Sequence, residues 1–262
     1  MSLFYDYDWA VKYLFENDNI LFERRIDYIF YYLSGYDAGT EVYAGRIPEK
    51  SFFHKFWNWM IDNLDDYTPE SVYWYNYFRD KSSKTNISED LLFYDEFTKF
   101  DKAYKKEELK MSSDELLYSQ HDDCEILQVF LANKKPGSMI KERKVSYIFY
   151  IFLGTDMFLK MNRNIDITTN IIFKFGDWLF DKYPEYDKNE IGIFWYLIIE
   201  KQAVLRNKDE LELLVELFKE FFHNHENKNI TYDDKTGVIH ETNSEGSIRI
   251  ISIFTINNKS NK

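Results

Sequence analysis

The sequence predicts a mainly α-helical protein built from two similar helical units, with a small antiparallel β-meander near its C-terminal end. Three observations predict this fold class. Apolar residues recur with helical spacing along most of the chain, which contains only 4 Pro and 9 Gly in 262 residues. One stretch of sequence near the N-terminus returns in the second half. Residues 229–257 are instead rich in β-branched residues and contain turn sequences.

The internal repeat begins with a strong local match. Residues 23–31 read ERRIDYIFY and residues 142–150 read ERKVSYIFY. The alignment continues through Gly35/Gly154, Asp37/Asp156, Trp59/Trp178 and, after a two-residue shift, Trp74/Trp195, Asn86/Asn207 and Phe100/Phe221. A collinear match over about 80 residues predicts an internal duplication, with about four helices in each copy.

The helices expected from the apolar periodicity span 5–17, 22–34, 50–64, 69–80, 88–101 and, at the end of the second copy, 208–223. The helix at 22–34 is apolar on nearly all sides and should be buried. Thr68 and Pro69 are predicted to be the N-cap and the first residue of their helix. Gly35 and Gly154 are predicted to end their helices in the left-handed cap conformation.

The expected organisation has five parts. They are an N-terminal half at 1–101 that contains copy 1 at about 23–100, a helical connector at 102–141, copy 2 at 142–226, a three-stranded meander at 229–257 and a polar tail at 258–262. The turn sequences at 234–237 and 243–246 separate the strands of the meander. The meander has no counterpart after copy 1, so it was added once.

Charge and composition restrict the classes of partner. The net charge is −12 and the isoelectric point is about 5.0, whereas a protein that contacts many phosphates would be basic. We therefore expect no nucleic-acid or membrane partner, and negative charge favours the capture of a basic protein. A single cysteine, Cys124, and an N-terminus without signal-peptide features predict a cytoplasmic protein.

No catalytic or phosphate-binding motif is present, since GxGxxG, GxxxxGK[ST], HExxH and GxSxG are all absent. Three weaker groups remain: His223 with His225, the run at 121–124 (HDDC) and the carboxylates at 62–66. Helix ends and caps explain each group more simply than metal or nucleophile chemistry. The sequence therefore predicts neither an enzyme nor a cofactor or metal.

Exposed carboxylates are the predicted partner-binding residues. They form two groups, Asp62, Asp65, Asp66 and Glu70 in the first copy and Asp122, Asp123 and Glu125 in the connector. A few aromatic or charged residues usually dominate the affinity of an interface. The β-meander is a second candidate surface, because a small sheet can offer an open edge to a partner.

The chain is small and acidic. It also contains an aromatic helix at 28–32 (YIFYY) and the acidic group Asp62, Asp65, Asp66 and Glu70. In this general character the chain resembles the helical immunity proteins of bacterial polymorphic and contact-dependent toxin systems. The resemblance implies an intracellular protein that neutralises a cognate basic toxin, for example a nuclease, by direct occlusion. It identifies no site residues.

Two other classes of function remain open. A helical enzyme with an aromatic-lined cavity would have carboxylates that converge on a large interior pocket. An adaptor of the α-solenoid kind would stack helix pairs around a concave surface.

Overall fold

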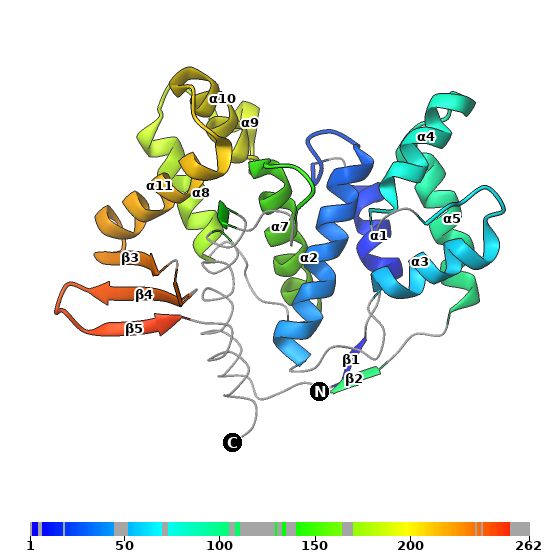
Figure 1. Cartoon of the computed structure of the whole chain (residues 1–262), viewed down its shortest axis with the longest axis horizontal. Coiled ribbons are helices and arrows are strands. Elements are labelled where there is room, and N and C mark those ends of the chain that lie inside the picture. Colours follow the sequence, from blue (N-terminus) through cyan, green and yellow to red (C-terminus); the bar gives the residue numbers. More distant parts are fainter. Residues whose placement is uncertain are drawn as a thin grey trace. The chain divides into compact units, whose positions relative to one another are not determined.

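The computed structural model describes residues 2–4, 7–17, 19–44, 52–69, 73–104, 108–110, 129, 133–134, 140–163, 170–233, 235–236 and 238–251 (Figure 1). It is mainly helical and has a small three-stranded antiparallel sheet towards the C-terminal end, as predicted. Most of the expected connector at 102–141 lies outside the described residues. No described helix has both the length and the apolar character needed to cross a membrane.

The chain divides into two compact units. Unit 1 comprises Met1–Met111 and Tyr150–Ile165, and unit 2 comprises Ser112–Phe149 and Asp166–Lys262. Unit 1 contains β1 (Ser2–Phe4), α1 (Tyr7–Glu16), α2 (Ile26–Ala44), α3 (Phe52–Asn63), α4 (Tyr75–Thr85), α5 (Glu89–Ala103) and β2 (Glu108–Lys110). Strands β1 and β2 pair antiparallel, which the sequence analysis did not predict. Helix α7 (Val145–Arg163) contributes its first residues to unit 2 and the remainder to unit 1.

Among its described residues, unit 2 contains four further helices and the sheet, besides the start of α7. They are α8 (Ile171–Lys182), α9 (Lys188–Ile191), α10 (Tyr196–Arg206), α11 (Glu210–Asn224), β3 (Lys228–Asp233), β4 (Val238–Asn243) and β5 (Ile248–Ile251). The predicted helices at 5–17, 50–64, 88–101 and 208–223 agree with α1, α3, α5 and α11 to within a few residues.

Helices that align in sequence have equal lengths. Helices α2 and α7 both contain 19 residues, α3 and α8 contain 12, α4 and α10 contain 11, and α5 and α11 contain 15. The ends of α4 and α10 also match, because Asn86 (φ 57°) and Asn207 (φ 50°) both adopt the left-handed conformation. Asparagine tolerates this conformation better than most residues and so ends helices well.

The core of each unit is built around one tryptophan. In unit 1, Trp74 stacks on Phe93 with ring centroids 5.1 Å apart and meets Phe56 edge-on at 5.4 Å. In unit 2, Trp195 meets Phe175 edge-on at 5.3 Å. Edge-to-face and offset pairs are the favoured arrangements of aromatic rings, so the high aromatic content fills both cores.

Gly35 and Gly154 do not end their helices, so that prediction is wrong. Helix α2 continues to Ala44 and α7 continues to Arg163. A Cβ atom on Gly35 would lie 1.8 Å from the carbonyl oxygen of Ile151, and one on Gly154 would lie 1.9 Å from that of Tyr32. The two glycines therefore allow α2 and α7, which lie side by side in Figure 1, to cross with their backbones in contact.

The predicted helix start at Thr68 and Pro69 is also wrong. Both residues lie outside any helix, and α4 begins at Tyr75 and runs to Thr85. Trp74, which precedes α4, and Tyr75, its first residue, are almost fully buried. Core packing of these two rings sets the start of the helix, and it overrides the local preference of proline for a first turn.

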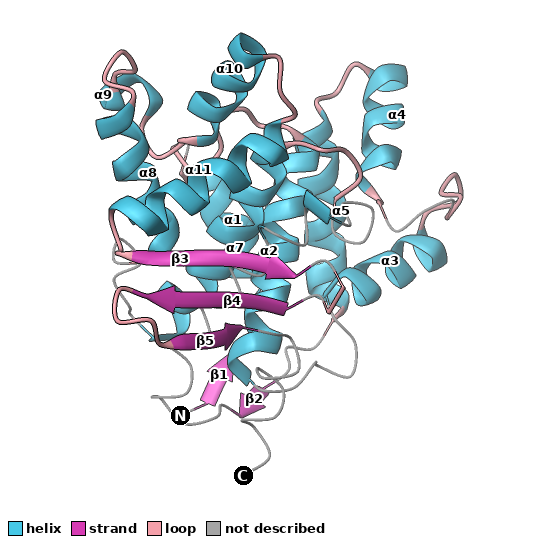
Figure 2. Ribbon diagram, turned by 60° about the vertical axis from the view of Figure 1, so that its left-hand side comes forward, coloured by secondary structure: helices cyan, strands magenta, loops and turns pink. Residues whose placement is uncertain are grey.

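The three-stranded meander is confirmed, with strand order β3–β4–β5 (Figure 2). Ile230 of β3 pairs with Glu241 of β4, which pairs with Arg249 of β5. One face of the sheet is covered, because Ile230, Ile239 and Ile251 alternate with exposed or half-buried residues and are buried. Helix α11 packs against β3.

Candidate partner-binding site

The first predicted carboxylate group lies on the surface of unit 1. Asp62 is on the last turn of α3, and Asp65 and Asp66 are in the turn that follows. All three side chains are exposed. Backbone hydrogen bonds from Leu64 to Met60 (3.0 Å) and from Tyr67 to Leu64 (3.1 Å) fix this turn. The turn therefore presents its carboxylates from a defined backbone.

The other predicted site residues fall outside the described part of the chain. They are Glu70 of the first group and Asp122, Asp123 and Glu125 of the second. Their proposed role in binding stays a prediction from the sequence.

A tyrosine on α4 anchors the acidic turn. The Tyr77 hydroxyl donates a hydrogen bond to Oδ1 of Asp66 (2.8 Å) and accepts one from Nζ of Lys81 (2.6 Å). The ring of Tyr67 meets the ring of Tyr77 at an interplanar angle of 88°, with centroids 5.3 Å apart. One carboxylate and one aromatic ring of the turn are thus held against α4.

Glu96 of α5 adds a buried carboxylate to this group. It is only 7% exposed, and its Oε1 accepts a hydrogen bond from Nζ of Lys99 (3.1 Å). Lys99 also pairs with Asp95 (2.7 Å). Among the residues that the structure describes, the other oxygen of Glu96, Oε2, has no hydrogen-bond partner. Asp66, Tyr67, Tyr77, Lys81 and Glu96 are called the Tyr77 cluster below.

The electrostatics of the cluster are dominated by negative charge. Burial raises the pKa of Tyr77 far above its ordinary value, and the Asp66 hydrogen bond and the charges of Asp66 and Glu96 raise it further. Burial also raises the pKa of Tyr67. Both phenols therefore stay protonated at neutral pH, and the Tyr77 hydroxyl can remain a donor to Asp66.

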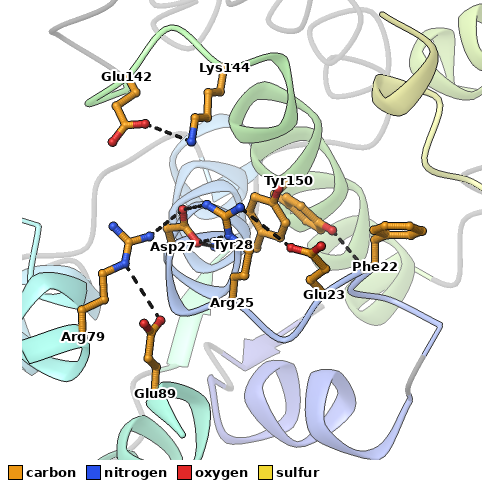
Figure 3. A network of polar contacts seen from close by, with 10 residues as sticks. All are labelled: Phe22, Glu23, Arg25, Asp27, Tyr28, Arg79, Glu89, Glu142, Lys144 and Tyr150. Carbon is orange, nitrogen blue, oxygen red and sulfur yellow. Dashed lines mark hydrogen bonds and ion pairs between the residues drawn. The ribbon is translucent and has the colours of Figure 1, made fainter. Parts of the chain in front are cut away.

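A polar network at the N-terminal end of α2 positions the helices that carry the cluster (Figure 3). Asp27, which has no exposed surface, lies between Arg25 (2.6 Å) and Arg79 (2.8 Å). Arg79 also approaches Glu89 at 3.9 Å. Because Arg79 belongs to α4 and Glu89 to α5, the network connects α2 to the two helices that bear Tyr77 and Glu96.

Sequence reasoning missed Tyr77, Lys81, Glu96 and the Asp27 network. The alignment of the two similar stretches of sequence held a usable signal. The positions that align with Tyr77 and Glu96 are Ile198 and Leu217, and the position that aligns with Asp27 is Ser146. Polar residues of the first aligned stretch thus stand opposite smaller or apolar residues of the second, at positions that are buried for Asp27 and Glu96 and half-buried for Tyr77.

The remaining groups from the sequence analysis form no metal site in the described residues. His223 Nδ1 lies 2.9 Å from Oδ1 of Asn229, and the ring of His225 stacks on Phe221 with centroids 5.2 Å apart. No set of three or more His, Cys, Asp and Glu side chains in the described ranges is placed to hold a metal ion. The run at 121–124 lies outside those ranges.

Comparisons of the chain with protein families, with curated proteins and with solved structures find no match. Any function must therefore be argued from the site itself.

Proposed function

We propose that the protein captures a basic partner protein through the acidic surface of unit 1 and neutralises it by occupying it, as an immunity protein neutralises a toxin. The observation that carries this proposal is the turn after α3. Asp62, Asp65 and Asp66 are exposed there, and the hydrogen bond from Tyr77 to Asp66 restrains the turn. A turn that is ordered before binding loses less conformational entropy when the partner arrives.

The distribution of charge supports this surface. Residues 1–101 contain 19 Asp and Glu against 10 Lys and Arg, whereas residues 142–226 contain 15 against 11. The stretch of sequence that carries the acidic turn therefore has the larger excess of negative charge, while each compact unit as a whole has an excess of six carboxylates over basic residues. Such an excess speeds the encounter with a basic protein and disfavours acidic competitors.

Tyr67 supplies the aromatic contact that protein interfaces favour. It lies directly after Asp66 and is half-buried against Tyr77, so part of its side chain remains exposed. Tyrosine offers a large and rigid contact area at low entropic cost, and it is enriched at the centre of interfaces. We place Tyr67 at the centre and Asp62 and Asp65 at the rim of the binding surface.

We further propose that the two helical units arose by internal duplication and that copy 1 acquired the binding role. The equal lengths of aligned helices and the matched left-handed Asn86 and Asn207 support the duplication. The replacement of Tyr77 and Glu96 by Ile198 and Leu217 supports the specialisation. Copy 2 then serves as scaffold and carries the sheet.

The test is affinity capture from the source organism with three forms of the tagged full-length chain. They are the wild type, the charge reversal D62K/D65K/D66K, and the control D181K/E185K/E190K, which changes the same number of exposed charges in unit 2. We expect the wild type and the control to retain one basic protein in stoichiometric amount. The reversal at the acidic turn should reduce its retention by about tenfold or more, because like charges then face each other.

The same three forms separate neutralisation from mere binding. Co-expression of the captured protein should arrest growth unless the wild type or the control form is present. If all three forms capture the partner and protect the cells equally well, the acidic turn is not the binding surface.

A further inference from the structure

We propose that the Tyr77 cluster is a receptor for one cationic side chain, a lysine or an arginine, of the partner. This inference rests on the proposed function and names the contact that would give it specificity. The feature behind it is the carboxylate of Glu96, which is buried and yet has an oxygen without a partner in the described part of the chain.

The fold does not require a carboxylate at this position. The aligned residue of copy 2 is Leu217, which is almost fully buried at the equivalent place on α11. Burial of a charged group is unfavourable, and a buried acceptor without a donor makes it more so. A charge held at a site where leucine would pack points to a use in binding rather than in stability.

The Tyr77 cluster and the adjacent Asp95 and Lys99 together carry one negative charge that is not balanced. Asp66, Asp95 and Glu96 carry three negative charges, and Lys81 and Lys99 carry two positive charges that are already paired with them or with Tyr77. One further ammonium or guanidinium group would balance this local charge. Glu96 Oε2 would accept a charge-assisted hydrogen bond, which is stronger than a neutral one.

The surrounding rings suit a cation as well. Lys81 Nζ already lies 5.0 Å from the centroid of the Tyr77 ring, which shows that the ring accepts an ammonium group. Aromatic faces attract cations through their quadrupole. Lys99, whose side chain is 53% exposed, contacts only the other oxygen of Glu96, Oε1, at 3.1 Å.

The test uses the full-length chain and three blocked tripeptides, Gly-Lys-Gly, Gly-Arg-Gly and Gly-norleucine-Gly, titrated in separate NMR experiments. The Lys or Arg peptide should shift resonances of α4 and α5, and the norleucine peptide should not. The variants E96L and Y77I take the residues that copy 2 has at these positions. E96L should lower the affinity for the cationic peptide by about tenfold or more, since one charge-assisted hydrogen bond is lost.

Stability provides the second readout. E96L should be at least as resistant to urea as the wild type, because a buried carboxylate is replaced by leucine. Equal shifts with norleucine, unchanged affinity of E96L for both cationic peptides, or strong destabilisation by E96L would overturn the receptor. The cationic peptide that binds with the higher affinity identifies the side chain of the partner, lysine or arginine.

Capture of the partner separates this inference from the proposed function. If D62K/D65K/D66K loses the basic protein while E96L retains it with wild-type affinity, the cation receptor is wrong and the acidic surface stands. If D62K/D65K/D66K retains the basic protein as well as the wild type does, the proposed function is wrong whatever E96L does.

Discussion

Nη2 of Arg79 lies 2.8 Å from Oδ2 of Asp27, a carboxylate with no exposed surface. Arg25 reaches the same oxygen at 2.6 Å. Two guanidinium groups thus compensate one buried charge, and they do so at the point where α2 meets α4. This ion pair holds the helix that carries Tyr77, so the candidate site depends on a contact that lies outside it.

Substitution D27N should destabilise unit 1 strongly. Removal of one partner from a buried ion pair costs roughly 3–5 kcal/mol, and we expect about 2–3 kcal/mol here because both arginines are about one-third exposed. Urea unfolding measures the effect. The control D95N removes the exposed partner of Lys99 and should cost less than about 0.5 kcal/mol. Equal effects of the two variants would contradict the buried role of Asp27.

Substitution G35A should disrupt the crossing of α2 and α7. The added methyl group would lie 1.8 Å from the carbonyl oxygen of Ile151, so one helix must move. Overpacking of this kind costs about 1–3 kcal/mol or more, which thermal unfolding would detect. The control G192A adds a methyl group where no atom lies within 4 Å, although its φ of +62° also disfavours alanine. A smaller loss of stability in G35A than in G192A would show that the backbones are not in contact.

The phenol of Tyr77 should resist ionisation. Burial and the nearby charges of Asp66 and Glu96 raise its pKa, so an alkaline titration followed by NMR should show exposed tyrosines ionising first, near pH 10. Because the pKa of Tyr77 is higher in the folded than in the unfolded state, its contribution to stability is fully present below about pH 10, the unfolded value. This contribution is lost as the pH rises through the folded pKa. D66N should lower the pKa of Tyr77. An unchanged titration in D66N would show that the hydrogen bond to Asp66 is absent in solution.

The stabilising effect of Asp209 should depend on pH. Its hydrogen bond with Arg143 lowers its pKa, and it also caps α11 by accepting hydrogen bonds from Leu211 and Glu212. D209N keeps a capping side chain but loses the charge, so it should cost about 1 kcal/mol at neutral pH. The contribution of a group with a lowered folded pKa is present above its unfolded pKa, near 3.9, and is lost as the pH falls through the folded value.

Urea unfolding of D209N and the wild type at pH 7 and at pH 3 measures this difference. The difference in unfolding free energy between the wild type and D209N should be smaller at pH 3 than at pH 7. An equal difference in unfolding free energy at the two pH values would mean that Asp209 stabilises the fold through the helix cap rather than through its charge pair with Arg143.

Much of the fold could be predicted from the sequence because it depends on local pattern. Apolar residues at helical spacing placed α3, α5 and α11, and turn sequences between β-branched runs placed the three strands. The exposed carboxylates Asp62, Asp65 and Asp66 were found in the same way, since a run of acidic residues at a helix end belongs on the surface.

Contacts between distant residues decided the rest. A glycine that ends a helix and a glycine that lets two helices touch look alike in sequence, and only the backbone of Ile151 shows which role Gly35 has. Glu96 has no sequence feature that marks it as buried, yet it is buried on α5, a helix that packs against α4. Periodicity therefore determined which segments are helices and strands, because hydrogen bonding and side-chain spacing within a segment are local. The tertiary structure decided which polar groups are buried together, because burial depends on partners that the neighbouring sequence does not contain.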